Sequence, residues 1–356
     1  MKSLFSLAFL LLQAHALVFN YNDSSLSNDD SNIRGRDTIK LANLVPRADE
    51  GSYCSPPTID VSPGTRKNRL RRQARANVYG AQSPNPAQLW RRMYIPMTQN
   101  TNFLSEWITT QVGLTGVENN IVIKNDGNPR IITRPQLVSD FGITTWRPFA
   151  RETTEFSLAA SRLCGCTSLL IFNHVGVFFT HWWESVSFQV PPLQAFLDIA
   201  GAIDHNDLFQ KTVIDGLHNG YHPVPGSSEM DQVSLAGAPA AAFLSDTANL
   251  KAYFFRPSTE SIARRNQDYQ AEWDSIKSTV MNILQLPSTV NAGWWNEVEY
   301  DALNPIKDKE RLANTGAGKI LFKYDPKDTK KFPEKEPQQR AALLFQNQVI
   351  FDEAWA

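Results

Sequence analysis

The sequence predicts an α+β fold in which a mixed or antiparallel β-sheet or sandwich is flanked by helices. Apolar residues recur every three or four positions at 101–114, 204–220 and 259–287, which is the spacing of an amphipathic helix. Short runs rich in β-branched and aromatic residues predict strands at 121–133, 167–183, 249–257, 318–326 and 343–355. Hydrophobic residues make up 42% of the 356 residues, which is enough for a sizeable core.

The first half of the predicted single domain, residues 76–356, combines helix and hairpin signals. Residues 101–114 place their apolar side chains on one helical face, and a glycine near the end favours termination there. Residues 121–133 predict a hairpin, because two β-rich runs flank an Asn-Asp-Gly-Asn-Pro stretch. Residues 156–165 predict a short helix that ends at its final glycine, and a second hairpin follows at 167–183.

The second half of the predicted domain alternates between helices and strands. Residues 204–220 predict a helix that is capped by aspartate and closed by glycine. Residues 249–257 predict a strand that is stopped by proline, and 259–287 predict one long helix. The two late β-rich runs, 318–326 and 343–355, predict a strand each.

The N-terminus carries the pattern of a secretory signal peptide at residues 1–16. One lysine precedes an apolar run from Leu4 to Leu12, and Ala-His-Ala follows as a small-residue cleavage site. No later stretch reaches the roughly 18 apolar residues that a membrane-spanning helix needs. We therefore expect a secreted, extracellular protein without a membrane span.

Residues 17–75 predict a disordered region or a removable pro-segment. They are polar, lack the periodicity of a core, and end in the basic run 65–75. The pair Arg71-Arg72 resembles the dibasic sites that processing proteases of the secretory pathway cut. A solvated basic linker is the alternative interpretation.

The charge balance and the motifs exclude several classes of function. The formal net charge is −1, which argues against a role dominated by nucleic acid. No glycine-rich nucleotide loop and no metal-ligand spacing of known type occurs, so we expect neither a cofactor nor a metal. The expected partner is a protein substrate or another secreted protein.

The chain has three cysteines, Cys54, Cys164 and Cys166. An exported protein can form disulfides, and an odd number leaves one thiol unpaired or pairs two chains. One arrangement joins Cys54 to Cys164 and leaves Cys166 free. A bridge between Cys164 and Cys166 is the alternative.

The 167–183 hairpin predicts that a thiol and an imidazole come together. With Asn173 and His174 as the turn, the pairing sets Cys166 directly opposite His181, where Cβ atoms lie about 4.5–5.5 Å apart. A turn shifted by one residue would instead set Trp183 opposite Cys166 and leave His181 diagonal to it. An imidazole beside a thiol can accept its proton and hold the thiolate, and Gly165 would let a substrate approach the backbone. The alternative interpretation is a buried core hairpin, because cysteine is among the most buried residue types.

The segment Leu163-Cys164-Gly165-Cys166-Thr167, followed by His181, resembles the Leu-Ser-Gly-Cys motif and histidine of bacterial glutamine deamidases. These include the catalytic domain of cytotoxic necrotizing factor and the chemoreceptor deamidases. The resemblance implies that Cys166 attacks a glutamine side-chain amide with His181 as base. Ammonia then leaves and the thioester is hydrolysed, or is transferred to an amine in some members. Cys164 stands where the motif has serine.

The same resemblance implies a third group that orients the histidine, which in the family is often a backbone carbonyl upstream of the cysteine. The 121–133 hairpin is the candidate source, with Thr133 as the candidate residue. The segments GCTSLL, THWWESVSF and GKILFKYDP also resemble secreted fungal proteins of unknown activity.

Two functions therefore follow from the sequence. The first is a secreted thiol-dependent amidohydrolase, either a protein-glutamine deamidase or a transglutaminase-like enzyme, and a toxin-like role follows from the resemblance alone. The alternative is a non-enzymatic secreted protein that binds a partner or a glycan through an aromatic patch, for which the Trp182-Trp183 and Trp294-Trp295 pairs are candidates.

Overall fold

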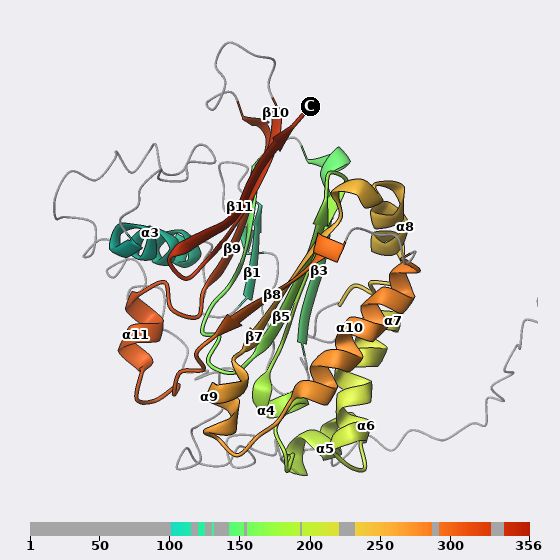
Figure 1. Cartoon of the computed structure of the whole chain (residues 1–356), viewed down its shortest axis with the longest axis vertical. Coiled ribbons are helices and arrows are strands. Elements are labelled where there is room, and N and C mark those ends of the chain that lie inside the picture. Colours follow the sequence, from blue (N-terminus) through green and yellow to red (C-terminus); the bar gives the residue numbers. More distant parts are fainter. Residues whose placement is uncertain are drawn as a thin grey trace, which may run out of the picture. The chain divides into compact units, whose positions relative to one another are not determined.

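The structure is a computed structural model, in which two β-sheets pack with helices on their outer faces (Figure 1). It describes residues 101–114, 120–124, 130–131, 142–152, 155–192, 194–220, 232–286, 292–328 and 338–356. These residues all fall in one compact unit, 42–356. The expected signal peptide, the expected pro-segment, Cys54 and Thr133 lie outside the described residues.

The first sheet contains six strands in the order β11-β10-β9-β4-β1-β2. Each neighbouring pair in it is antiparallel. Its strands are β1 (Asn120–Lys124), β2 (Arg130–Ile131), β4 (Phe156–Ala160), β9 (Ile320–Asp328), β10 (Gln338–Phe345) and β11 (Gln348–Trp355). The predicted 121–133 hairpin is confirmed, because β1 and β2 pair with Ile123 opposite Ile131.

The second sheet contains five strands in the order β3-β6-β5-β7-β8. Its strands are β3 (Gly142–Pro148), β5 (Thr167–Asn173), β6 (Gly176–Trp182), β7 (Lys251–Pro257) and β8 (Trp295–Tyr300). β7 and β8 run parallel, and the other described pairs are antiparallel. The predicted α+β class with a mixed or antiparallel sandwich is therefore confirmed.

The helices vary from single turns to four turns in length. They are α3 (Thr101–Leu114), α4 (Glu184–Ser187), α5 (Gln194–Ala200), α6 (His205–Phe209), α7 (Asp215–Asn219), α8 (Ala238–Ser245), α9 (Thr259–Ala263), α10 (Gln270–Leu284) and α11 (Lys309–Asn314). A π-helical stretch, Gln210–Ile214, joins α6 to α7, so the predicted helix at 204–220 is continuous. None of the helices in the described part of the chain combines the length and the apolar character needed to cross a membrane.

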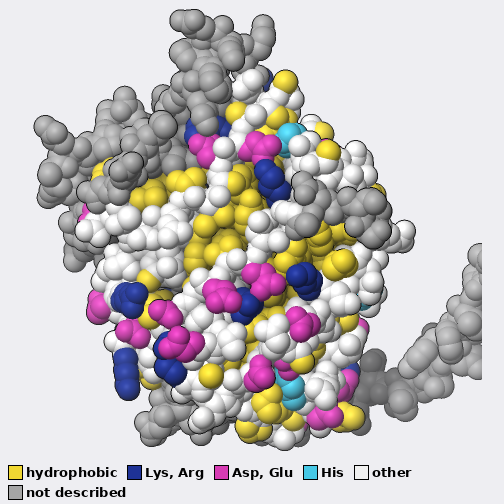
Figure 2. Space-filling view, viewed as in Figure 1, with side chains coloured by type: hydrophobic (Ala, Val, Ile, Leu, Met, Phe, Trp, Pro, Cys, Tyr) yellow, Lys and Arg dark blue, Asp and Glu magenta, His cyan; other side chains and the backbone are white. Residues whose placement is uncertain are grey.

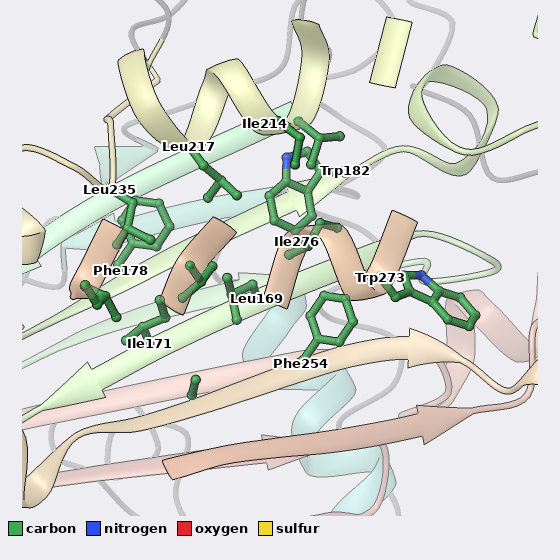
Figure 3. Close-up of a cluster of buried hydrophobic side chains, with 14 of the residues drawn as sticks. Leu169, Ile171, Phe178, Trp182, Ile214, Leu217, Leu235, Phe254, Trp273 and Ile276 are labelled. Carbon is green, nitrogen blue, oxygen red and sulfur yellow. The ribbon is translucent and has the colours of Figure 1, made fainter. Parts of the chain in front are cut away.

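The layers follow from the alternation of side chains along the strands. On β5, Leu170 and Phe172 face the other sheet, where they pack in one buried cluster with Phe322 and Leu343. The intervening residues point to the opposite face, which α7, α8 and α10 cover. Figure 3 shows this second cluster, with Leu169, Ile171, Phe178 and Phe254 from the sheet and Leu217, Trp273 and Ile276 from the helices. The helix α3 packs on the outer face of the six-stranded sheet through Leu104, Trp107 and Ile108.

Three predicted elements differ from the structure. The helix expected at 156–165 is β4 followed by a loop, because its alternating apolar side chains pack into the inter-sheet core. The long helix expected at 259–287 is divided into α9 and α10 by a turn in which Asn266 has φ 54°. The strand expected at 343–355 is a hairpin of β10 and β11, and Gln346 at its turn has φ 56°.

Candidate functional site

The β5–β6 hairpin turns one residue later than the simplest prediction. Asn173 pairs with Gly176 across the ladder, so His174 and Val175 form the turn, and Ser168 rather than Cys166 lies directly opposite His181. The predicted direct opposition is therefore wrong, and the register shifted by one residue is the one observed, with Thr167 and Trp182 as its last pair. The side chain of Asn173 explains the shift. Its Oδ1 accepts hydrogen bonds from the backbone N–H of Val175 (2.9 Å) and of Gly176 (3.2 Å), as aspartates and asparagines do at turns.

Ser168 and His181 lie on the same side of the hairpin, and Cys166 directly precedes the first strand of this ladder. His181 has the same parity along β6 as Phe179, which faces the other sheet, and Ser168 matches it on β5. Cys166 is two residues before Ser168 and directly precedes β5, so it lies outside the ladder that pairs Ser168 with His181. Trp183 connects the two, because its ring contacts that of His181 at 4.4 Å and it shares a buried cluster with Cys166.

His181 is enclosed within the core. Its side chain belongs to a residue that is 1% exposed, and neither ring nitrogen has a hydrogen-bond partner among the described residues. Among the same residues, the buried hydroxyl of Ser168, which lies across the ladder, also has no partner. Burial lowers the pKa of His181 from 6.5 to about 3. The imidazole is therefore neutral at physiological pH, with its lone pair unused.

The two cysteines of the loop are in different states. The first expected arrangement had Cys164 bridged and Cys166 free, and the structure shows the reverse. Cys166 is disulfide-bonded and fully buried, whereas Cys164 is a free, buried thiol. A Cys54–Cys164 bridge and a Cys164–Cys166 bridge are both inconsistent with these states. The one other cysteine of the sequence, Cys54, lies outside the described residues. Burial, and next the carboxylate of Glu184, raise the pKa of the Cys164 thiol far above its usual range, so this thiol is unreactive.

A buried ion pair holds the backbone of the cysteine loop. Arg265 donates to both carboxylate oxygens of Glu184, at 3.0 and 2.9 Å. The same guanidinium donates to the backbone carbonyl of Cys164 at 2.8 Å and to that of Leu303 at 2.9 Å. Glu184 is fully buried, and the hydroxyl of Tyr269 also donates to it at 3.3 Å. The loop is therefore fixed to α4, to the end of α9 and to the start of α10.

The glycine of the motif is required by this carboxylate. A Cβ atom at Gly165 would lie 1.9 Å from Oε2 of Glu184, so any side chain at this position collides with the ion pair. Gly165 was expected to let a substrate approach the backbone, but in the structure the Glu184 carboxylate occupies the space beside it. Beyond it, the hydroxyl of Tyr300 donates to the carbonyl of Cys166 at 2.5 Å, and the N–H of Leu163 donates to the carbonyl of Gly318 at 2.9 Å.

Two further histidines, His174 and His205, have structural contacts. His174 stacks on Trp355 at 4.4 Å and interacts with Glu353 at 3.0 Å, and His205 interacts with Glu272 at 2.8 Å. The tryptophans Trp182, Trp183 and Trp294 are buried, and Trp295 is partly exposed. Within the described ranges, no three His, Cys, Asp or Glu side chains form a group that could hold a metal. Thr133 cannot be assigned a role from geometry, since it lies outside those ranges.

The fold and site define a two-sheet sandwich with a buried cysteine loop close to a histidine that has no hydrogen-bond partner among the described residues. No protein-family model, no curated protein and no solved structure matches the chain.

Proposed function

We propose that the chain is a secreted thiol-dependent amidohydrolase, with Cys166 as nucleophile and His181 as base, and that the described form is its latent, oxidised state. The supporting observation is the histidine. A buried polar atom without a partner costs about 1–3 kcal/mol, and buried side chains are normally satisfied for that reason. Among the described residues, neither ring nitrogen of His181 has a partner, and the strand that pairs with that of His181 begins one residue after Cys166. A catalytic base accounts for this cost, because its lone pair must remain available to a thiol.

In the proposed reaction, the free thiol of Cys166 gives its proton to His181 and the sulfur attacks the amide carbon of a glutamine side chain. The imidazolium returns the proton to the leaving nitrogen, which departs as ammonia. Water then attacks the thioester and yields glutamate, or an amine attacks it and yields a substituted amide. A histidine with a pKa of about 3 is a poor base, so the reactive form must admit water, which moves the pKa back toward 6.5.

The same proposal explains why the backbone around Cys166 is held so firmly. A nucleophile has to stay within a fraction of an ångström of its productive position. The hydrogen bonds from Arg265 to the carbonyl of Cys164 and from Tyr300 to the carbonyl of Cys166 restrain the loop on both sides of Gly165. Secretion is supported by the N-terminal signal pattern and by the disulfide state of Cys166, which oxidising compartments permit.

The test measures the reactivity of Cys166 in the reduced protein. Wild type, His181→Asn and the matched control Cys164→Ser are reduced, alkylated with iodoacetamide from pH 5 to 9, and mapped by mass spectrometry. We expect Cys166 to alkylate rapidly below pH 7 in wild type and in the control, and slowly in His181→Asn. In parallel, ammonia release from a glutamine-rich protein such as casein should require both residues. The proposal is refuted if the rate of Cys166 alkylation in all three proteins depends on pH as that of an ordinary thiol with a pKa of about 8.5.

A second candidate, a non-enzymatic binding role, is favoured by one surface. β8 and β11 are the end strands of the two described sheets. Between them, Val298, Ile350 and Phe351 are partly buried hydrophobic residues at the margin of the inter-sheet core. Figure 2 shows hydrophobic side chains gathered on this face, with charged residues above and below them. This role predicts that the protein binds to an oligosaccharide array, that Val298→Lys abolishes the binding, and that Cys166→Ala leaves it unchanged. Equal binding by wild type and Val298→Lys would exclude this role.

A further inference from the structure

We propose that Ser168 is a positioning residue for His181: its hydroxyl accepts a hydrogen bond from one ring nitrogen and leaves the other nitrogen for a thiol. The inference rests on the proposed function for its consequence, but the contact can be tested by itself. Ser168 on β5 pairs directly with His181 on β6, and both residues are buried. Among the described residues, neither the serine hydroxyl nor either ring nitrogen has a hydrogen-bond partner. Two polar groups that lack partners therefore face each other across one position of the ladder.

The row of side chains across the five-stranded sheet gives His181 one polar neighbour. Strand pairing places Ile143 beside His181 on β3 and Ser168 beside it on β5. Beyond Ser168, the row continues with Phe255 on β7 and Val298 on β8. Because the other three neighbours in the row are apolar, Ser168 is its one side chain that can form a hydrogen bond with the ring.

Directly paired side chains of this sheet are close enough for such a bond. Their Cβ atoms typically lie about 4.5–5.5 Å apart. One position away, on the opposite face of the sheet, Thr144 and Thr180 pair in the same way, and their hydroxyls lie 2.9 Å apart. Ser168 and His181 are not hydrogen-bonded to each other in the described form. Rotation of the serine side chain would bring its hydroxyl to the ring without movement of the backbone, while the contact with the Trp183 ring at 4.4 Å restrains the imidazole.

The bond becomes stronger at the step in which the base acts. In the described form Cys166 is disulfide-bonded and the imidazole is neutral. In the reduced protein, transfer of the Cys166 proton gives the ring an N–H on each nitrogen and a positive charge. A hydrogen bond from a charged donor is roughly twice as strong as one between neutral groups. Ser168 therefore stabilises the imidazolium and makes His181 a stronger base, and no proton moves to the serine.

The first measurement tests the contact. The full chain is labelled with ¹⁵N at histidine and reduced with dithiothreitol, and the ring nitrogens of His181, assigned by their loss in His181→Asn, are observed by NMR at pH 7. We expect one tautomer in wild type and a mixture of both in Ser168→Ala. Ser168→Thr keeps a hydroxyl and should restore the single tautomer. The control Thr144→Val removes a buried hydroxyl from the opposite face and should match wild type.

The second measurement tests the consequence for the thiol. In the reduced protein at pH 6, iodoacetamide should modify Cys166 about tenfold more slowly in Ser168→Ala than in wild type, which corresponds to the loss of one hydrogen bond to a charged group. Ser168→Thr and Thr144→Val should keep the wild-type rate. A purely structural role of Ser168 would lower the stability of the fold and leave the pH dependence of this rate unchanged.

Two results would overturn the positioning role: the same tautomer in Ser168→Ala as in wild type, or an unchanged alkylation rate in Ser168→Ala while His181→Asn slows alkylation. The proposed function fails separately. If His181→Asn and wild type alkylate with the same pH dependence, the nucleophile–base pair is refuted, and the tautomer in Ser168→Ala still decides whether Ser168 orients the ring. If alkylation requires His181 but Ser168→Ala matches wild type in both measurements, the pair holds and the positioning role is refuted.

Discussion

Lowering the pH should destabilise the folded chain through His181. The unfolded chain binds a proton at this histidine below pH 6.5, whereas in the folded chain the pKa is about 3 because the ring is buried. The free energy of unfolding therefore decreases as the pH falls through this window, and the decrease stops near pH 3. Each pH unit contributes about 1.4 kcal/mol, which gives about 2 kcal/mol by pH 5 and about 5 kcal/mol by pH 3.

The size of this effect makes it measurable. A loss of about 5 kcal/mol is comparable to the whole stability of many domains. Urea unfolding followed by tryptophan fluorescence at pH 7, 6, 5 and 4 would give the free energy of unfolding of wild type and of His181→Leu. We expect the decline below pH 6.5 to become shallower in His181→Leu, because the leucine side chain cannot bind a proton.

A control separates this titration from general weakening of the core. Leu170→Ala removes a fully buried side chain from the same face of the hairpin and should lower the stability by about 2–5 kcal/mol at every pH. Its decline below pH 6.5 should remain that of wild type. The reasoning about His181 is refuted if wild type and His181→Leu have parallel pH profiles, or if wild type is equally stable at pH 7 and pH 5.

Three further substitutions test the packing around the site and the outer face of the first sheet. Gly165→Ala should lower the free energy of unfolding by about 1–3 kcal/mol, because the added Cβ overlaps Glu184. Thermal unfolding measures this, with Gly216→Ala as the control, because a Cβ at Gly216 would meet nothing within 4 Å. Arg265→Met should lower the free energy of unfolding, measured in urea, by about 3–5 kcal/mol, because Glu184 is left charged and buried. Adding Glu184→Gln to this variant should restore part of the lost stability. Burial lowers the pKa of Lys323 from 10.5 to about 8. The free energy of unfolding of wild type should therefore rise by about 3 kcal/mol from pH 8 to pH 10.5, and that of Lys323→Met should rise less.

Each of these predictions has an outcome that contradicts it. Equal melting temperatures for the two glycine variants would mean that Glu184 can move aside. A double variant no more stable than Arg265→Met would show that the unpaired charge is not the source of the loss. A Lys323→Met profile parallel to wild type, while the exposed control Lys307→Met also matches wild type, would show that Lys323 does not titrate near pH 8.

The sequence predicts the class of fold because strand alternation and helical spacing are local patterns. The segment 156–165 was predicted wrongly for the same reason. Its apolar run is too short to distinguish helix from strand, and the neighbours β1 and β9 that make it a strand are distant in the sequence. The division of 259–287 into α9 and α10 depends on Asn266, whose left-handed φ carries no strong local signal.

The candidate site was only partly predictable. The spacing indicated a hairpin at 167–183, and of the two registers considered, the one shifted by one residue is the correct one. The ion pair between Glu184 and Arg265 was missed, because its residues are 81 positions apart and each is an ordinary charged residue in the sequence. The states of Cys164 and Cys166 also depend on tertiary contacts, since sequence allows each cysteine to pair with the others.

The amide of Asn173 has an effect far from its own contacts. Its Oδ1 defines the turn, and its Nδ2 donates to the carbonyls of Ala242 and Asp246 at the end of α8, so both halves of the amide are in use. Ser168, which faces His181, is five residues from this turn, or about 17 Å along an antiparallel strand. A substitution at position 173 that lets the turn move by one residue would change which side chain His181 meets without touching the histidine. The residue that lies opposite His181 is thus determined by the turn at the other end of the hairpin.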